Sequence, residues 1–165
     1  MIDIAVAGIG GFGVHNLKPL LGAPETADFR LVGAVDPHAS HSPLLDELKR
    51  REIPLFDSLE DFYANGRADL VILSTPIHLH ASQTMTALRH GSNVLCEKPL
   101  CATITEANQM AEAQQKAGKH VAIGYQASFS VAVQRVKADI LAGRFGRPIR
   151  LKTIVHHPEY RNLAG

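Results

Sequence analysis

The chain has 165 residues, of which 45% are hydrophobic and 20% charged, with a formal net charge of +1 at pH 7. This is enough apolar material for one sizeable core. Basic residues are interleaved with acids, which argues against a nucleic-acid partner or an anionic membrane surface. Two cysteines, Cys96 and Cys101, are too few for a disulfide framework. The chain starts without a basic leader, and its apolar runs are too short to cross a bilayer. We therefore expect a soluble, cytoplasmic protein with reduced thiols.

Short apolar runs alternate with longer helical patterns along most of the chain. The expected strands are residues 2–7, 31–35, 71–73, 94–96 and 120–123, with a further short strand possible at 53–56. Strands that are almost continuously apolar are buried on both faces, which is typical of a parallel sheet covered by helices. The alternation of strands and helices predicts an α/β fold with a doubly wound parallel sheet.

Helix boundaries are signalled by local chemistry. Ser58 is followed by acidic residues and resembles a helix cap, and Gly66 is expected to close that helix. Further helices are expected at about residues 44–48, from 77 to 90, and from 104 to 117. In the last of these, Ala107, Met110 and Ala111 are predicted to face the core.

The last forty residues follow a different pattern. Residues 130–142 predict an amphipathic helix, and residues 149–155 alternate as in a strand with one wet face. We therefore divide the chain into a dinucleotide-binding domain, 1–124, and residues 125–165, the connecting helix and first strand of a truncated C-terminal α+β domain. An unpaired strand favours association, so residues 149–165 are expected either to pack against a second copy, as in a homo-oligomer, or to be poorly ordered.

A glycine-rich turn follows the first expected strand directly. It reads Gly8-Ile9-Gly10-Gly11-Phe12-Gly13. Gly8 permits a tight turn, Gly10 lets the backbone approach a pyrophosphate, and Gly13 lets the first helix pack closely on the strand. The start of that helix offers unpaired N–H groups to the anion. These features predict a Rossmann fold whose turn, including Gly11 and Phe12, binds the cofactor.

Asp36 ends the second expected strand, 23 residues after Gly13. A carboxylate there accepts hydrogen bonds from the adenosine ribose. It also repels a 2′-phosphate, and no lysine or arginine lies between Pro37 and Pro43, so NAD is preferred over NADP. Asp36 could instead cap a helix or a turn before Pro37; the spacing favours the cofactor role, and both roles are compatible. A methyltransferase that binds S-adenosylmethionine is a weaker alternative, because Gly13 favours a dinucleotide.

Polar residues follow two further expected strands. Ser74, Thr75 and Pro76 come after one of them, with His80 four residues on, and Glu97-Lys98-Pro99 comes after the next. Because the carboxyl ends of parallel strands form the ligand crevice, these groups are expected at one edge. Lys98 could hydrogen-bond a substrate oxygen and assist proton transfer, or it could be a solvated loop lysine paired with Glu97.

These residues together resemble the N-terminal part of the Gfo/Idh/MocA oxidoreductase family. The resemblance rests on the glycine turn, Ser74-Thr75-Pro76 with His80, the segment 91–100 that contains Glu97-Lys98-Pro99, Gly124-Tyr125-Gln126, and the segment 143–149. It implies an NAD(P)-dependent oxidoreductase acting on a sugar, inositol or related polyol. It also implies that Lys98 is catalytic and that Ser74, Thr75, Pro76, His80 and Glu97 border the cofactor. Further catalytic residues of the family, in a larger C-terminal domain, have no counterpart here.

Two readings remain open for function. The first is the cofactor-binding part of a dehydrogenase, inactive as this chain alone because the substrate cleft lacks a wall. The second is a non-catalytic dinucleotide-binding or sensing module. Two histidine pairs, His78 with His80 and His156 with His157, do not complete a ligand set, so no metal is expected.

Overall fold

A computed structural model describes residues 1–24, 26–147 and 149–152, and the chain divides into two compact units, Met1–Tyr125 and Gln126–Gly165. The first unit contains a six-stranded sheet in the order β3-β2-β1-β4-β5-β6. All five neighbouring strand pairs are parallel. The strands are β1 (Ile2–Ala7), β2 (Phe29–Val35), β3 (Leu55–Phe56), β4 (Leu70–Leu73), β5 (Asn93–Cys96) and β6 (Val121–Ile123). The predicted doubly wound α/β fold is confirmed, and the order of strands is that of a Rossmann fold.

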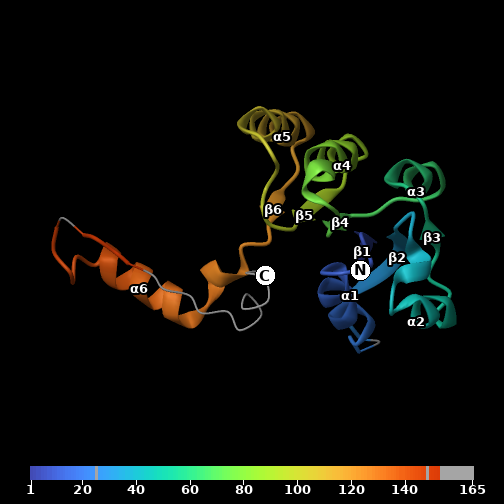
Figure 1. The fold of residues 1–165 in the computed structure, drawn as a ribbon, viewed down its shortest axis with the longest axis horizontal. Coiled ribbons are helices and arrows are strands. Elements are labelled where there is room, and N and C mark those ends of the chain that lie inside the picture. Colours follow the sequence, from blue (N-terminus) through green and yellow to red (C-terminus); the bar gives the residue numbers. More distant parts are fainter. Residues whose placement is uncertain (25, 148, 153–165) are drawn as a thin grey trace, which may run out of the picture. The chain divides into compact units, whose positions relative to one another are not determined.

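Helices cover both faces of the sheet in the first unit (Figure 1). They are α1 (Gly13–Leu21), α2 (Leu45–Arg50), α3 (Leu59–Asn65), α4 (Ile77–Arg89) and α5 (Ile104–Ala117). Figure 1 shows α3, α4 and α5 on one face and α1 and α2 on the other. The helices before β3 therefore lie on one face of the sheet, and the helices after β3 lie on the other.

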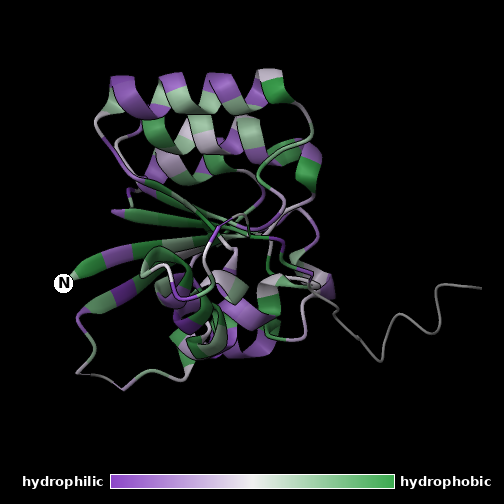
Figure 2. Ribbon diagram, turned by 90° about the vertical axis from the view of Figure 1, so that its left-hand side faces the viewer, coloured by the Kyte–Doolittle hydropathy of each residue, from purple (hydrophilic) through white to green (hydrophobic). Residues whose placement is uncertain are grey.

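The core has one apolar cluster on each face of the sheet. Side chains of β1 alternate between them: Ala5 and Ala7 belong to the cluster with Phe62, whereas Ile4 and Val6 belong to the cluster with Leu17. The strands are accordingly hydrophobic over most of their length, as the largely green colouring of the strands in Figure 2 shows. Burial on both faces is the reason for the continuous apolar runs in the sequence.

Most of the predicted helix boundaries are confirmed. Ser58 caps α3 by accepting a hydrogen bond from the Asp61 backbone N–H, and Gly66 ends that helix. Thr103 and Glu106 form a capping box at the start of α5. At its end, Gly118 adopts φ 61°, in the left-handed region that favours glycine.

One prediction about the orientation of α5 is wrong. Ala111 is exposed, whereas Met110 is buried and Ala113 and Ala117 pack against the core. The buried positions follow a spacing of three to four residues from Met110, and Ala111 lies about 100° around the helix from it. Alanine is tolerated on either face of a helix, so its identity alone did not fix the orientation.

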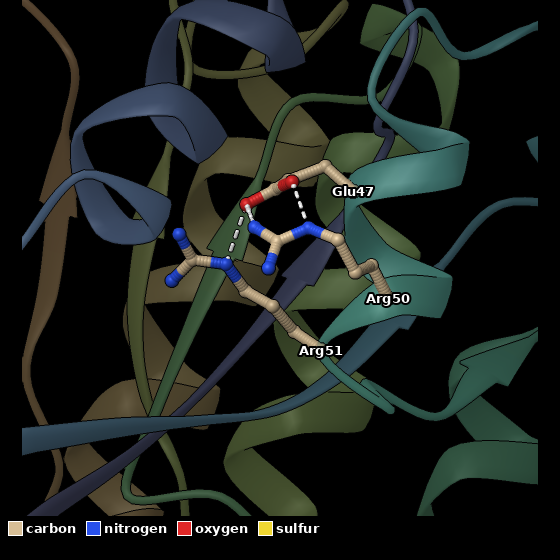
Figure 3. Close-up of polar contacts among 3 residues, drawn as sticks. All are labelled: Glu47, Arg50 and Arg51. Carbon is tan, nitrogen blue, oxygen red and sulfur yellow. Dashed lines mark hydrogen bonds and ion pairs between the residues drawn. The ribbon is translucent and has the colours of Figure 1, made fainter.

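Helix α2 carries a cluster of charged side chains on its surface (Figure 3). The Glu47 carboxylate accepts hydrogen bonds from Arg50, at 3.0 and 2.6 Å, and from the Nε of Arg51, at 2.6 Å. These bonds hold the pKa of Glu47 below its usual range. Because the arginine side chains are largely exposed, the ion pairs contribute little to the stability of the fold.

The second unit contains the helix predicted after residue 130. Helix α6 (Val131–Leu141) is capped by Ser130, whose hydroxyl accepts a hydrogen bond from Val133 N–H. The strand predicted at 149–155 is not formed at 149–152, and residues 153–155 lie outside the described part. A strand needs a hydrogen-bonding partner, and none of the described elements pairs with this segment. No helix among the described residues has the length and apolar character needed to cross a membrane.

Candidate cofactor-binding site

The site lies where the order of strands reverses, between β1 and β4. Ala7 and Leu73, the last residues of these strands, are partners in the register, and the Ser74 N–H donates to the Ala7 carbonyl at 2.7 Å. Gly8 and Ser74 therefore leave the sheet side by side. In open α/β sheets this switch point is where ligands bind.

The glycines of the turn serve two different purposes. Gly8 has φ +81°, and a Cβ on it would lie 2.5 Å from the carbonyl oxygen of Ser74. A Cβ on Gly13 would lie 1.8 Å from the carbonyl oxygen of Gly8, so these two positions are closed by the protein's own backbone. Gly10 and Gly11 instead have no heavy atom within 4 Å of a built Cβ. The turn is thus tightly packed at Gly8 and Gly13 and open at Gly10 and Gly11. A pyrophosphate can contact the backbone only where such space is open.

The start of α1 has donors available for an anion. Phe12 is the residue before the helix, and no side chain of the described residues caps it. Two N–H groups at the start of α1 are already used, because Gly13 donates to the Gly10 carbonyl and His15 to the Phe12 carbonyl, each at 2.9 Å. An anion would meet the other first N–H groups, which have no i−4 partner within the helix, and the positive end of the helix dipole. The geometry therefore fits the pyrophosphate of a dinucleotide.

A cavity of about 690 Å³ opens in front of the turn. Its lining includes eight of the residues predicted from the sequence, Gly8, Gly10, Gly11, Phe12, Asp36, Ser74, Thr75 and Pro76. It also includes Asp57 and Glu60, from the segment after β3 and the start of α3. Among the described residues, no lysine or arginine lines it, so the electrostatics of the cavity disfavour an additional phosphate.

The carboxylate of Asp36 is hydrogen-bonded to the backbone of the glycine turn. One oxygen accepts a hydrogen bond from the Ile9 N–H at 3.0 Å, and the other accepts one from the His38 N–H at 2.8 Å. The capping interpretation is therefore confirmed. Each carboxylate oxygen has a second lone pair, so the same group could still accept from ribose hydroxyls. Both interpretations of Asp36 are compatible in one conformation.

His80 is predicted to border the cofactor, but it does not line the cavity. The residue is 1% exposed, with Nδ1 2.8 Å from the Pro99 carbonyl oxygen and Nε2 2.8 Å from the Thr75 carbonyl oxygen. The His80 ring therefore lies between the segment that follows β4 and the segment that follows β5, and it contacts the backbone of both. His78, which lies on the exposed side of α4, lines the cavity instead.

Glu97 and Lys98 lie outside the cavity lining but next to the turn. The Lys98 Nζ is 4.7 Å from the centroid of the Phe12 ring, and the lysine is otherwise exposed. The Glu97 carboxylate accepts a hydrogen bond from the Asn16 side-chain amide at 3.1 Å. Because β1 and β5 are parallel strands of one sheet, they end at the same edge. The segment Glu97-Lys98 that follows β5 therefore lies next to the start of α1, as the sequence predicts.

Besides the further lining residues Asp57, Glu60 and His78, two residues that hydrogen-bond to predicted site residues were not found from the sequence. Asn16 of α1 donates to both Ser74 and Glu97, and Gln83 of α4 accepts a hydrogen bond from the Thr75 hydroxyl at 2.5 Å. Neither belongs to a motif. The only signal for Asn16 is its position one helical turn after Phe12, on the same side of α1.

Cys96 and the potential metal ligands add no further chemistry to the site in the described residues. Cys96 is buried, and desolvation raises the pKa of its thiol to about 12, so it is unreactive at neutral pH. No group of three or more potential metal ligands is found in the described ranges.

The fold and the turn define a dinucleotide-binding Rossmann protein. The family model described as "Oxidoreductase family, NAD-binding Rossmann fold" matches residues 2–125. The chain belongs to this family, the Gfo/Idh/MocA oxidoreductases, which confirms the resemblance found in the sequence and its assignment to NAD-binding proteins.

Several relatives have known activities. The chain is 36% identical over 103 residues to 1,5-anhydro-D-fructose reductase of Ensifer adhaerens, covering 62% of this chain and 30% of the relative. It is 29% identical over 154 residues to scyllo-inositol 2-dehydrogenase (NAD(+)) of Bacillus subtilis, covering 92% and 43%. The chain thus spans less than half the length of these relatives.

Solved structures show the same fold. The WlbA dehydrogenase from Bordetella pertussis, in complex with NADH and UDP-GlcNAcA, superposes with a TM-score of 0.78 at 28% identity, covering 88% of this chain and 43% of the other. The scyllo-inositol dehydrogenase from Lactobacillus casei, with bound NAD(H) and scyllo-inositol, has a TM-score of 0.75 at 19% identity, which shows likeness of fold.

Proposed function

We propose that this chain is the cofactor-binding part of an NAD-dependent oxidoreductase that transfers a hydride between nicotinamide and a sugar, inositol or related polyol. The observation that carries the proposal is the contact between Lys98 and Phe12, because it joins the predicted catalytic lysine to the glycine turn. The relatives named above act on an anhydro sugar and on an inositol, which supports this class of substrate.

The proposed cofactor contacts follow from the cavity. The backbone of Gly10, Gly11 and Phe12 with the start of α1 would bind the pyrophosphate, and Asp36 would bind the adenosine ribose. The cofactor would be bordered by Ser74, Thr75 and Pro76. Gly13 and His80 would not contact it, but they would support the backbone of Gly8 and of Thr75, respectively. The acidic lining supports NAD over NADP.

Lys98 would act on the substrate oxygen. NAD supplies the hydride acceptor in such reactions, and its reduced form supplies the donor. As a substrate alcohol is oxidised, its hydroxyl proton must leave. The Lys98 side chain can accept that proton when it is a neutral amine, and as the ammonium it can hold the substrate oxygen by a hydrogen bond. Glu97 lies beside it and accepts a bond from the Lys98 backbone N–H at 3.3 Å, which fixes the start of this segment.

Fluorescence titration with NADH tests the proposal directly. Gly10→Val is expected to abolish binding nearly completely, because its side chain would occupy the open middle of the turn. Asp36→Ala is expected to weaken binding, and Asn108→Ala, on the exposed surface of α5, serves as the control. Unchanged NADH affinity in both site variants would refute the cofactor site. Activity is then sought with the longest natural form of the protein on sugars and inositols.

A non-catalytic dinucleotide-binding module is the second candidate. It is favoured by one observation: the cavity includes the turn and Asp36 but its described lining does not include Lys98. The two candidates differ in the effect of Lys98→Met in that longest form. If Lys98→Met loses turnover and keeps its NADH affinity, the enzyme is supported. If the wild-type protein binds NADH but turns over none of the sugars and inositols, the module is supported.

We further propose that residues 1–124 form the cofactor domain and that residues 125–165 begin a second domain, as the division into two units suggests. A cytoplasmic location is supported by two free cysteines, Cys96 and Cys101. Association of identical subunits is supported by the exposed apolar side chains of α6, such as Val131 and Leu141.

A further inference from the structure

Helix α1 contacts two consecutive residues of the segment that follows β5. Phe12, just before the helix, lies under the Lys98 ammonium, and Asn16, one turn later, donates to the Glu97 carboxylate. Residues four apart on a helix lie on the same side. The start of α1 therefore holds both Glu97 and Lys98, which are more than eighty residues away in the sequence.

The Asn16 amide group uses both of its hydrogens. Nδ2 lies 2.9 Å from the Ser74 hydroxyl oxygen and 3.1 Å from Glu97 Oε1, and a side-chain amide has two N–H donors. Asn16 thus joins the ends of β4 and β5 to the helix that carries the glycine turn. A part-buried amide that bridges three elements fixes their separation.

Glu97 is confined on its other sides as well. Its second oxygen accepts a hydrogen bond from the Lys98 N–H at 3.3 Å. A Cβ on Gly124, which follows β6, would lie 3.0 Å from that carboxylate, so the backbone there closes on Glu97. Together with Asn16, these contacts hold the Glu97 carboxylate on three sides, next to the backbone from which the Lys98 side chain starts.

We propose that Asn16 is a positioning residue for Lys98: by holding Glu97 against α1, it keeps the lysine over the Phe12 ring at the glycine turn. The inference rests on the proposed function for the role of Lys98 in the reaction. The placement of the lysine is a separate property of the chain and can be measured without a cofactor or a substrate.

The test uses ring-current shifts in the NMR spectrum of the whole chain. Lysines are labelled with ¹³C-methyl groups, which retain their charge, and the Lys98 signal is identified by its loss in Lys98→Arg. A methylammonium held over an aromatic face is shifted upfield, and Phe12→Leu removes the ring and defines the unshifted position. Asn16→Ala is expected to lose more than half of that upfield shift, whereas Asn108→Ala, on the exposed surface of α5, is expected to retain it.

A double variant separates positioning from simple loss of stability. In Asn16→Asp with Glu97→Gln the amide and the carboxylate exchange places, so one hydrogen bond between them is restored at unchanged net charge. We expect this variant to recover the upfield shift, and the Asn16→Asp single variant, which places two carboxylates together, to lose it.

Three results would overturn the inference: an Asn16→Ala spectrum with the full shift, a Phe12→Leu spectrum identical to wild type, or failure of the double variant to recover the shift while it remains folded by circular dichroism. An NADH titration of the same samples reports on the proposed function independently. Wild-type protein that shows the shift but does not bind NADH would refute the function and leave the positioning of Lys98 intact.

Discussion

Alanine substitutions at Gly10 and Gly13 are expected to differ in their effect on stability, although both residues belong to one turn. A Cβ on Gly13 would lie 1.8 Å from the Gly8 carbonyl oxygen and 2.8 Å from its carbon. Real Cβ atoms stay at least 3.0 Å from such neighbours, so the first contact alone requires a shift of about 1.2 Å. At Gly10 no heavy atom lies within 4 Å of the Cβ.

The magnitudes follow from these contacts. Overpacking against a backbone that cannot move aside destabilises a fold by about 1–3 kcal/mol, which corresponds to a fall in Tm of roughly 2–12 °C for a chain of this size. Gly10→Ala adds no clash and restricts the unfolded chain, so its Tm should stay the same or rise slightly. A methyl group at Gly10 does, however, keep an anion from the backbone, and we expect NADH affinity to fall about tenfold or more, or roughly 1.4 kcal/mol.

The two variants are compared by thermal unfolding and by NADH fluorescence titration. We expect Gly13→Ala to lower both Tm and affinity, and Gly10→Ala to lower affinity alone. Gly10→Ala with wild-type affinity would show that the open middle of the turn does not contact the cofactor. Gly13→Ala with wild-type Tm would show that the close approach of α1 to β1 does not carry the stability assigned to it.

Three further predictions concern other residues. Asp36→Asn should weaken NADH binding less than Asp36→Ala, because the amide oxygen can still accept one of the two backbone hydrogen bonds of the carboxylate; equal affinities for NADH and NADPH in wild type would contradict the role of this charge. Iodoacetamide at pH 8 should alkylate the half-buried Cys101 and not Cys96, whose thiol is buried with a pKa raised to about 12, as peptide mass spectrometry would show. The hydrogen bond from Arg30 lowers the pKa of Asp3, so its stabilisation is present above the ordinary value of 3.8 and is lost as the pH falls through the lowered value in the folded protein. The Tm difference between wild type and Arg30→Gln should therefore be small at pH 7, decrease with salt and vanish in acid.

The sequence by itself determined the fold class and the location of the cofactor turn. Apolar runs such as residues 71–73 predict strands buried on both faces, and the glycine spacing after the first strand predicts the turn. The cap at Ser58 and the stop at Gly66 were also readable, since their chemistry involves neighbours only a few residues away. Periodicity and capping depend only on residues close together in the chain, so a short stretch of sequence is enough to predict them.

Only the tertiary structure decided which distant groups meet. His80 lies only five residues after Thr75, yet in the folded chain it is buried, with both ring nitrogens within hydrogen-bond distance of backbone carbonyls. Asn16 has no motif around it and becomes a bridge to Ser74 and Glu97 only after β1, β4 and β5 align at one edge. Contacts between residues 58 and 81 positions apart depend on strand order and register, which are set by the packing of the whole sheet rather than by any one segment.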